Sequence, residues 1–361
     1  MRQQPARARD LGIVIGDLAP GPVNALTDVP GVRVGHATLI EGSDIRTGVT
    51  AVVPAGLLTA GAALPAALAV GNGYGKFIGA TQIAELGVIE TPVLLTATLS
   101  AFRAADALVG YVLGLPGHEA VQSVNPVVGE TNDGFLSDIR ARPVTAGHVH
   151  AALAGAAGGP VAEGAVGAGT GTGALGFKAG IGTSSRMLPR RRGGPLTIAA
   201  LVQANFSGTL RVSGVPVPAQ AALAGLGQAG QDSGEQAGNS CVIVVATDAA
   251  ADARQLRRIA RRALAALART GSDLAGGSGD YALAFSTASP GGPVIAEAGL
   301  EPLFRASADC AEEAILNSLF MAVTMTGRHG RVRHAVPHRR VLDACAAAGV
   351  LAATPPPTSG R

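Results

Sequence analysis

Short apolar runs rich in β-branched residues alternate along the chain with longer segments in which apolar residues recur at helical spacing. The clearest run is Ser-Cys-Val-Ile-Val-Val-Ala at residues 240–246, whose length and composition predict a buried strand. Further strands are predicted at residues 26–35, 50–54, 93–97 and 281–286. Strands mixed with helices in this way predict a layered α/β sandwich.

The most regular helical pattern follows Asp252. Apolar residues between positions 256 and 267 fall on one face of this segment, and five arginines between positions 254 and 262 fall mostly on the other. Asp252 at its start is favourable for the helix dipole. Four further helices are predicted at residues 81–87, 99–113, 311–323 and 339–348, with Ser100 as a candidate N-cap of the second.

Two glycine-rich segments separate the predicted elements. Residues 151–182 carry enough bulky side chains to predict a packed loop, so we place no domain boundary there and treat residues 1–361 as one domain. Residues 225–239 have almost no bulky apolar side chains and predict an exposed, mobile loop. Ser240 therefore stands where such a loop enters a core strand.

Composition and charge indicate which classes of partner the protein is expected to have. The chain has 361 residues, of which 47% are hydrophobic, and this is ample for a large core. The formal net charge is only +3, and much of the basic excess lies in two short runs, at residues 190–192 and 328–340. Because no aromatic residues interleave with these arginines, we expect solvated surface and no nucleic-acid partner.

Three cysteines, Cys241, Cys310 and Cys345, are odd in number and widely spaced. They offer neither a disulfide framework nor a paired metal motif, which favours a reducing, cytoplasmic location. Residues 57–70 are apolar but too short to cross a bilayer, and the N-terminus lacks the apolar core of a secretory signal. We expect no membrane partner.

Several familiar motifs fail on their context. Residues 171–176, Gly-Thr-Gly-Ala-Leu-Gly, match a dinucleotide fingerprint by letters, but no predicted strand precedes them and no helix follows. Residues 71–77 lack the glycine spacing and hydroxyl residue of a phosphate loop. The grouped histidines have no carboxylate or thiol at metal-ligand spacing and are expected at the surface. We therefore expect neither a cofactor nor a metal.

Ser240 offers serine chemistry without a histidine. A hydroxyl beside a peptide carbonyl can attack the preceding bond, form an ester by an N-to-O shift and, after hydrolysis, leave a free α-amine. That amine has an ordinary pKa of roughly 8, which suits a local base. An Asn-Ser pair in a glycine-rich loop is also typical of an ordinary turn, so the residues alone leave both interpretations open.

Two motifs flank the arginine-rich helix: Gly-Asn-Ser-Cys-Val-Ile-Val-Val-Ala-Thr-Asp-Ala at residues 238–249 and Gly-Ser-Gly-Asp-Tyr at residues 277–281. With other motifs in order along the chain, they resemble the DmpA-like aminopeptidases, peptidase family S58. This family includes the L-aminopeptidase/D-esterase and the β-peptidyl aminopeptidases. The other motifs lie at residues 7–12, 24–32, 129–134, 180–186, 202–206 and 316–320.

The resemblance implies an αββα sandwich of the N-terminal-nucleophile type, as in DmpA and the ornithine acetyltransferases. It implies a precursor that cleaves itself between Asn239 and Ser240 into chains 1–239 and 240–361 and assembles as a homo-oligomer, a tetramer of processed protomers. The expected activity is removal of N-terminal L-α, D or β residues from small peptides, amides or esters.

The resemblance also assigns roles to individual residues. Ser240 is the expected nucleophile, with Ser278 relaying or holding its proton and Asp280 orienting Ser278. Asn205 is expected to donate its side-chain amide to the oxyanion. Glu130 is expected to bind the free amino group of the substrate as an ion pair. Phe135 is the second residue expected to take part in substrate binding.

Two positions depart from the family pattern. Phe135 stands near the place of a tyrosine that contacts the nucleophile in one family member, and Asp280 stands where the family often has glutamate. These departures motivate one alternative, an unprocessed, non-catalytic member of the family. A second alternative is an acyltransferase like the ornithine acetyltransferases, although those carry threonine as the nucleophile and Ser240 argues against it.

Overall fold

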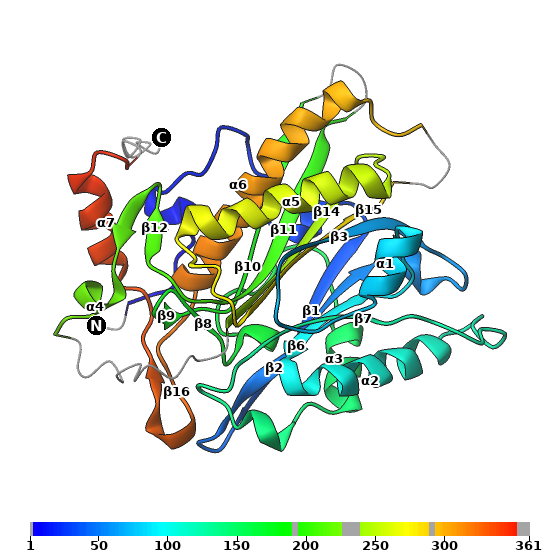
Figure 1. The fold of residues 1–361 in the computed structure, drawn as a ribbon, viewed down its shortest axis with the longest axis horizontal. Helices are drawn as coiled ribbons and strands as arrows, with labels where there is room; N and C mark the ends of the chain where they lie inside the picture. Colours follow the sequence, from blue (N-terminus) through cyan, green and yellow to red (C-terminus); the bar gives the residue numbers. More distant parts are fainter. Residues whose placement is uncertain (1–2, 190–193, 226–238, 289–292, 352–361) are drawn as a thin grey trace, which may run out of the picture.

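The computed structural model describes residues 3–189, 194–225, 239–288 and 293–351. Two β-sheets are stacked at its centre, and helices cover both outer faces (Figure 1). The first sheet has the strand order β1-β2-β6-β7-β4, and the second has the order β10-β11-β14-β15-β3-β5. Together these layers form the predicted αββα sandwich.

Both sheets combine parallel and antiparallel neighbours. The first sheet consists of β1 (Val32–Glu41), β2 (Ile45–Pro54), β4 (Phe77–Ile78), β6 (Val93–Ala97) and β7 (Val127–Thr131). The second consists of β3 (Leu64–Gly73), β5 (Val88–Ile89), β10 (Ile181–Leu188), β11 (Leu196–Asn205), β14 (Asn239–Thr247) and β15 (Ser278–Ser286). Three two-stranded ribbons are β8 (Gly173–Ala174) with β9 (Phe177–Lys178), β12 (Leu210–Val212) with β13 (Val215–Val217), and β16 (Met325–Thr326) with β17 (Val332–Arg333).

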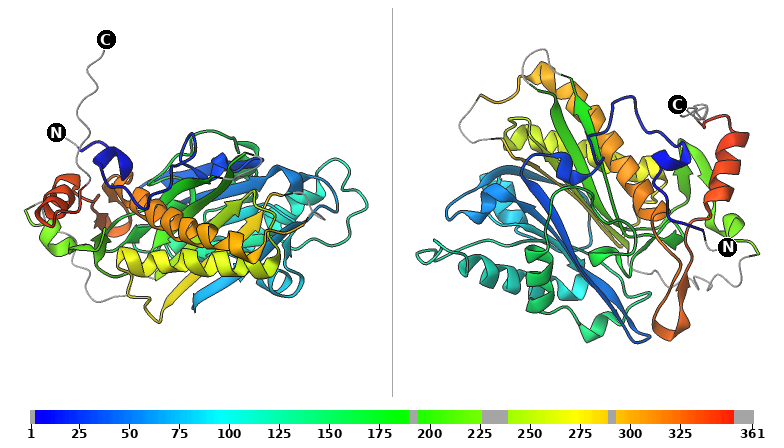
Figure 2. Two further views of the ribbon diagram at one scale, coloured as in Figure 1. Left: turned by 90° about the horizontal axis from the view of Figure 1, so that it is seen from above. Right: turned by 180° about the vertical axis from the view of Figure 1, so that it is seen from behind.

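Two pairs of helices form the outer layers. Helices α5 (Ala253–Thr270) and α6 (Leu300–Phe320) pack together on the second sheet, where Figure 2 shows them on one side of the molecule. Helices α2 (Ala101–Leu113) and α3 (Ala146–Ala154) cover the first sheet. The other helices of the described residues are α1 (Ala80–Leu86), α4 (Ala219–Ala222) and α7 (His338–Ala347). None of the described helices is long and apolar enough to cross a membrane.

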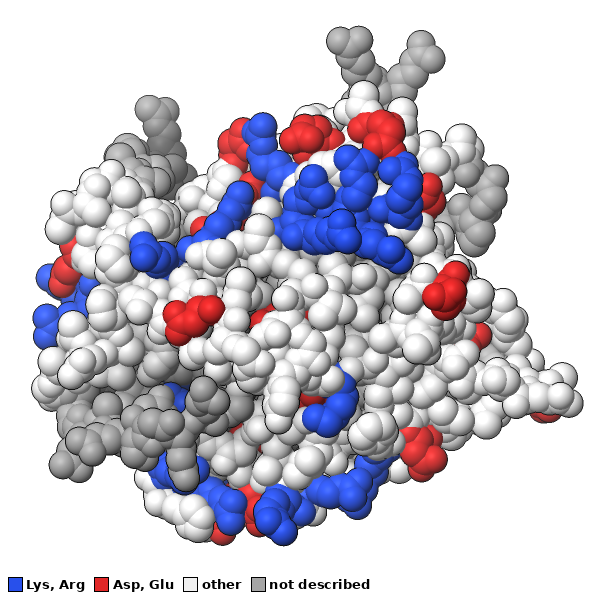
Figure 3. Space-filling view, viewed as in Figure 1, with Lys and Arg blue, Asp and Glu red and all other residues white. Residues whose placement is uncertain are grey.

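Helix α5 connects the two parallel strands at the centre of the second sheet, β14 and β15. Asp252 caps its start by accepting a hydrogen bond of 2.7 Å from the backbone N–H of Gln255. Gly271 ends it in the left-handed conformation, with φ of 99°. The predicted arginine face is confirmed as solvated surface, and Figure 3 shows it as the blue area at the top of the view.

Alternation along β14 places the nucleophile candidate between the two sheets. Cys241, Ile243 and Val245 belong to the core shared with α5 and α6. Val242 and Val244 belong to the core between the sheets. Because successive side chains of a strand point to opposite faces, Ser240 shares the face of Val242 and lies between the sheets, at the N-terminal end of its strand.

The structure corrects several predicted boundaries. Residues 26–35 are not one strand, because Leu26–Asp28 forms a 3-10 turn and β1 starts at Val32. Strand β15 starts at Ser278 rather than at residue 281, so the predicted glycine loop is partly strand. Helix α6 begins at Leu300, well before the predicted residue 311. Strand β3, whose Ala-rich sequence carries no strand signal, was missed.

Two smaller predictions also need correction. Ser100 occupies the N-cap position of α2 but makes no side-chain capping bond. His338, expected at the surface, is buried, and its Nε2 lies 3.0 Å from the backbone oxygen of Phe320. The predicted mobile loop, except for residues 225 and 239, lies outside the described residues.

A buried ion-pair network, here called the Glu313 network, joins α6 to the N-terminal segment. Glu313 is completely buried, and Arg186 of β10 donates to its Oε2 at 2.7 Å. Arg9 donates to the same carboxylate at 3.0 Å, and Asn24 donates to its Oε1 at 2.6 Å. Both carboxylate oxygens of Glu313 are therefore satisfied.

Candidate active site

Ser240 lies in the central strand of the second sheet, with one candidate catalytic strand on each side. The register places it opposite Asn205 of β11 and opposite Gly279 of β15. Its hydroxyl donates a hydrogen bond to the carbonyl oxygen of Asn239, the residue on the other side of the predicted cleavage bond. Asn239 is itself the first residue of β14, so the peptide bond at which cleavage is predicted lies inside the strand.

Asn205 is oriented by a backbone group. Its side-chain oxygen accepts a hydrogen bond of 3.1 Å from the N–H of Gly173. An amide whose oxygen faces Gly173 presents its NH2 group in the other direction, as an oxyanion donor must. Gly173 belongs to residues 171–176, the glycine-rich segment that failed as a dinucleotide motif, and sequence reasoning did not indicate this role.

Lys178 anchors the β8–β9 ribbon that contains Gly173. Its ammonium group is completely buried and donates to the backbone oxygens of Gly169, at 3.0 Å, and of Ala179. Burial lowers the pKa of Lys178 to about 7. Lys178 thereby ties the ribbon to the backbone that precedes it, at Gly169, and to the backbone that follows it, at Ala179.

Ser278 and Asp280 form a hydroxyl–carboxylate pair on the strand next to the nucleophile. Ser278 Oγ donates to Asp280 Oδ1 at 2.8 Å, so the shorter aspartate still reaches the serine. In the ladder, Ser278 lies opposite Asn239 and Asp280 opposite Cys241. Burial raises the pKa of Asp280, while hydrogen bonds from the Ser278 hydroxyl and the Cys241 N–H act in the opposite direction.

Glu130, at the end of β7, is 1% exposed and has one satisfied oxygen. Its Oε1 accepts the backbone N–H of Lys76 at 2.8 Å, and the ammonium group of Lys76 lies 3.6 Å away. Its Oε2 is buried and has no hydrogen-bond partner among the described residues. Burying a carboxylate oxygen without a hydrogen-bond donor lowers the stability of the fold, unless a bound ligand provides the donor.

Gln203 connects the strand of Asn205 to the strand of Glu130. Its side-chain NH2 group donates to the hydroxyl of Thr131 at 2.8 Å and to the backbone oxygen of Thr96 at 3.2 Å. Its position two residues before Asn205 places it on the same strand face. The motif at 202–206 includes Gln203, but the sequence alone assigned it no role.

Phe135 does not provide a polar contact. Its half-buried ring packs against two guanidinium groups, with the central carbon of Arg333 at 4.0 Å and that of Arg331 at 5.3 Å from the ring centroid. The predicted role of Phe135 in substrate binding therefore has to come from apolar or cation–π contacts of its ring.

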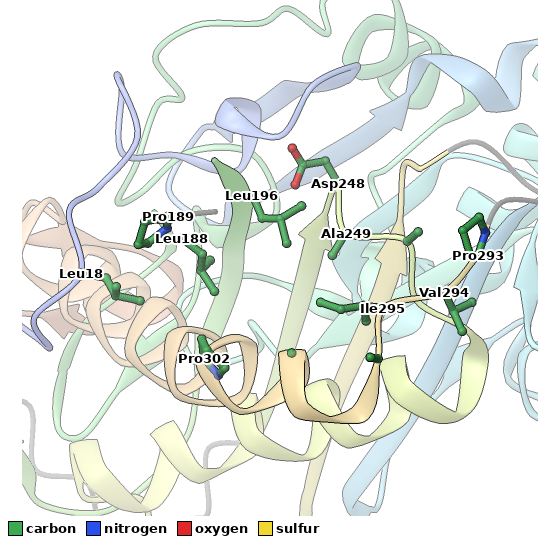
Figure 4. A pocket seen from close by; sticks show the side chains of 13 residues that line it. Leu18, Leu188, Pro189, Leu196, Asp248, Ala249, Pro293, Val294, Ile295 and Pro302 are labelled. Atoms are coloured by element: carbon green, nitrogen blue, oxygen red, sulfur yellow. The ribbon is translucent and has the colours of Figure 1, made fainter. Parts of the chain in front are cut away.

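A cavity of about 730 Å³ lies at the opposite end of β14, beyond Thr247 (Figure 4). Its wall is mostly apolar, and it contains none of the predicted site residues. Asp248 at its edge accepts a hydrogen bond of 2.7 Å from the N–H of Thr197. Among the described residues, no group of three or more His, Cys, Asp or Glu is arranged to hold a metal.

The fold and the geometry around Ser240 define a serine hydrolase of the N-terminal-nucleophile type. The model of peptidase family S58 matches residues 24–333, and the chain belongs to this family. It is 40% identical to the β-peptidyl aminopeptidase BapA of Sphingosinicella xenopeptidilytica, covering 92% of this chain and 89% of that protein.

Two solved structures support the assignment of fold and class. A β-aminopeptidase from Burkholderia sp. superposes with a TM-score of 0.84 at 39% identity, covering 97% of this chain and 100% of that one. The L-aminopeptidase D-Ala-esterase/amidase of Ochrobactrum anthropi superposes with a TM-score of 0.85 at 35% identity, covering 96% and 99%. The latter is described as a prototype of the serine aminopeptidases with a variant of the Ntn hydrolase fold.

The resemblance to family S58 and the predicted fold are thus confirmed, and the chain is a serine aminopeptidase. Its substrates belong to the peptides, amides and esters on which such enzymes act. The structure places Asn205, Ser240, Ser278 and Asp280 on three adjacent strands, with Asn205 in register with Ser240 and the Ser278–Asp280 pair in register with Asn239 and Cys241. Their individual catalytic roles stay predictions.

Proposed function

We propose that the protein cleaves itself between Asn239 and Ser240 and then uses Ser240 as the N-terminal nucleophile of an aminopeptidase. The observation that supports this most directly is the contact of the Ser240 hydroxyl with the carbonyl group of Asn239. Attack of Oγ on that carbonyl carbon transfers the acyl group from nitrogen to oxygen. Water then hydrolyses the ester, which gives residues 1–239 with a new carboxylate and residues 240–361 with a free α-amine.

In turnover, the α-amine of Ser240 accepts the hydroxyl proton as Oγ attacks the substrate carbonyl. The amide of Asn205 stabilises the oxyanion, and the proton passes to the leaving amine or alcohol as the bond breaks. Water releases the acyl group in the second half of the cycle. Ser278 donates to Asp280 and lies opposite Asn239 in the ladder, and this position supports a role of Ser278 in holding the proton of the amine.

Glu130 gives the site its preference for free amino groups. Its unpartnered Oε2 would accept the substrate ammonium as a charge-assisted hydrogen bond. An acetylated amine has neither the charge nor the same donors, so we expect blocked substrates to be rejected. The relatives named for β-peptides and for L- and D-amino acid derivatives make these three acyl classes the first to compare.

The test combines processing with activity. The Ser240→Ala variant is expected to remain one chain, with activity on alanine p-nitroanilide at least about 10⁴-fold lower than that of the processed enzyme. Intact-mass spectrometry and initial rates measure both effects. Ser43→Ala, at an exposed turn, is the matched control and should be cut and active. Efficient cleavage of Ser240→Ala at residue 239 would exclude the proposed nucleophile.

Assembly into a homo-oligomer, expected as a tetramer, is part of the same proposal. Phe102 and Leu113 support it, because both are exposed apolar residues of α2 and lie eleven positions apart, on one face of the helix. Light scattering coupled to size exclusion measures the mass. A monomer at micromolar concentration would contradict the expectation.

A further inference from the structure

A positive charge lies beside the carboxylate that is expected to bind the substrate. The ammonium group of Lys76 lies 3.6 Å from Oε1 of Glu130. This separation exceeds that of a hydrogen bond, so the contact between the two side chains is electrostatic alone. The backbone N–H of Lys76 donates to the same oxygen at 2.8 Å. Glu130 and Lys76 therefore form a pair of opposite charges that has no net charge.

The hydroxyl group of Thr98 holds the Lys76 ammonium group in place. It accepts a hydrogen bond of 2.7 Å from Nζ. Thr98 begins a 3-10 turn directly after β6, which is the parallel neighbour of β7, so Thr98 and Glu130 lie at the same edge of the first sheet. An ammonium group has three donors, and Thr98 is the one hydrogen-bond acceptor of Nζ among the described residues. Because 41% of the Lys76 side chain is exposed, its other donors are available to an anion from solvent.

The choice of lysine at this position matters for Glu130. The chain has 28 lysines and arginines, and only Lys76 and Lys178 are lysines. An arginine beside Glu130 could pair with both carboxylate oxygens through its planar fork. Lysine is a point charge, and Oε2 of Glu130 keeps no hydrogen-bond partner among the described residues. The pair therefore presents an acceptor and a donor side by side.

Gly75 links this charged pair to the nucleophile. A Cβ placed on Gly75 would lie 3.2 Å from Oε1 of Glu130 and 3.2 Å from the Cα of Gly279. Gly279 is the partner of Ser240 in the ladder between β14 and β15. Neighbouring strands are about 4.8 Å apart, so a ligand bound to Glu130 has the nucleophile within reach of a short acyl chain.

The two charges determine which head group fits. A substrate ammonium bound to Oε2 of Glu130 lies within roughly 9 Å of Lys76 Nζ, less than the screening length of about 10 Å at ordinary ionic strength. A plain amine thus brings a second cation to one carboxylate and is repelled by Lys76. A head group that carries a carboxylate on its amino-bearing carbon places each of its charges beside an opposite one, which offsets this repulsion.

We infer that Glu130 and Lys76 together bind an acyl group whose amino-bearing carbon also carries a free carboxylate, as in β-aspartyl peptides and amides. One CH2 group then separates the amino-bearing carbon from the scissile carbonyl, which is the spacing of the β-amino acyl groups in the proposed function. Ser240 Oγ bonds to the β-carbonyl carbon, and the amine leaves with the transferred proton. Water hydrolyses the resulting ester and releases aspartate. This inference rests on the proposed function, because it takes Ser240 as the nucleophile and Glu130 as the site of the amino group.

The experiment compares kcat/KM of the processed enzyme for three p-nitroanilides. These are β-aspartyl p-nitroanilide with its free α-carboxylate, the same compound with an α-carboxamide, and β-alanine p-nitroanilide. We expect the free acid to be favoured over the carboxamide by roughly tenfold or more, mainly through KM, as for a charge-assisted hydrogen bond. The free acid should also exceed β-alanine p-nitroanilide, which lacks the carboxylate.

The Lys76→Met variant should change two substrates in opposite directions. It removes the charge and keeps a long side chain, so the preference for the free acid over the carboxamide should fall close to one. The kcat/KM for β-alanine p-nitroanilide should rise, because its ammonium group no longer shares Glu130 with a second cation. General damage to the fold would lower both values. Thr98→Val, which removes the hydroxyl that holds Nζ, should reduce the preference in part.

A matched control removes a cation elsewhere. Arg257→Met, on the solvated face of α5, should leave the preference of the wild type unchanged. The melting temperature and the extent of self-cleavage of each variant are measured beside the rates. If Lys76→Met does not fold, the ratio of free acid to carboxamide in the wild type still tests the carboxylate subsite.

Four outcomes would contradict the proposals, each in a different part. A wild-type enzyme that cleaves β-alanine p-nitroanilide but treats free acid and carboxamide alike would refute the carboxylate subsite and leave the proposed function standing. Faster cleavage of γ-glutamyl p-nitroanilide than of the β-aspartyl compound would refute the assigned acyl length. A preference that Lys76→Met leaves intact would refute the role of Lys76. An uncut chain that is inactive on alanine p-nitroanilide would refute the proposed function as well.

Discussion

Two sets of buried carboxylates in this protein differ in how fully their oxygens are hydrogen-bonded. In the Glu313 network both oxygens of Glu313 are bonded, by Arg186, Arg9 and Asn24. Near Ser240, Glu130 and Asp280 each keep one buried oxygen without a hydrogen-bond partner among the described residues. The first set joins distant segments of the chain, and the second leaves binding capacity for a substrate or for the reacting groups.

This difference separates stability from function. A satisfied buried ion pair is strongly destabilised when one partner is removed, because the other charge stays buried. An unsatisfied buried carboxylate already costs free energy, so its neutral isostere is expected to be tolerated or even stabilising. Substitutions at the two sets should therefore change different measurements.

The largest expected effect on stability is that of Arg186→Met. The variant leaves Glu313 completely buried with weaker compensation, and we expect a loss of about 3–5 kcal/mol in the free energy of unfolding. Urea unfolding measures it. Arg339→Gln, which removes an exposed i,i+4 pair, should change the same quantity by less than about 0.5 kcal/mol. If both variants lowered the free energy of unfolding equally, the buried Glu313 network would contribute no more to stability than an exposed ion pair.

Glu130→Gln is expected to change activity and not stability. Loss of the carboxylate charge should lower kcat/KM for substrates with a free amino group by about 10- to 100-fold, mainly through KM, at an unchanged melting temperature. Steady-state kinetics and thermal unfolding are measured together, with exposed Glu41→Gln as the control. A large fall in melting temperature with little change in KM would place Glu130 with the structural carboxylates.

Asp280→Asn gives the smallest stability change and depends on pH. Because burial raises the pKa of Asp280 in the folded state, its ionised form costs stability once the pH rises through that pKa. The asparagine variant should therefore melt at a slightly higher temperature than the wild type at pH 8, and the gain should vanish at low pH, where Asp280 is protonated.

The same substitution should lower kcat and remove the acidic limb of the pH–rate profile, which in the wild type lies above the ordinary pKa of aspartate. Melting curves and rates between pH 4 and 9 measure both effects. A lower melting temperature at pH 8 would show that the ionised carboxylate stabilises the fold.

Much of the fold could be predicted from local patterns. Strand β6 has the predicted bounds, residues 93–97, and α5 follows the amphipathic pattern after Asp252. Strand β3 was missed because its Ala-rich sequence lacks β-branched residues, and its pairing with β15 makes it a strand. The first half of α6 was missed because burial on nearly all sides removes the polar face that gives helical periodicity.

The candidate site shows the same limit. Family resemblance indicated Ser240, Asn205, Ser278, Asp280 and Glu130. The structure places the first four on three adjacent strands and Glu130 near Gly279, the β15 partner of Ser240. Neither pattern nor resemblance indicated Gly173, Gln203 or Lys178 as parts of the site. Their roles depend on a backbone hydrogen bond, on hydrogen bonds between the two sheets and on a buried ammonium group that holds a ribbon, and none of these has a signal in local sequence.

Local sequence specifies the alternation of strands and helices, the buried strand that contains Ser240 and the motifs of family S58. These are local properties, because side-chain periodicity and motif spacing act over a few residues. The packing of distant segments sets which buried carboxylates are paired and which keep one oxygen without a hydrogen-bond partner among the described residues. The burial of a carboxylate and the presence of an ion-pair partner both depend on residues that are far apart in the sequence. The stacking of the two sheets and their helices brings these residues together.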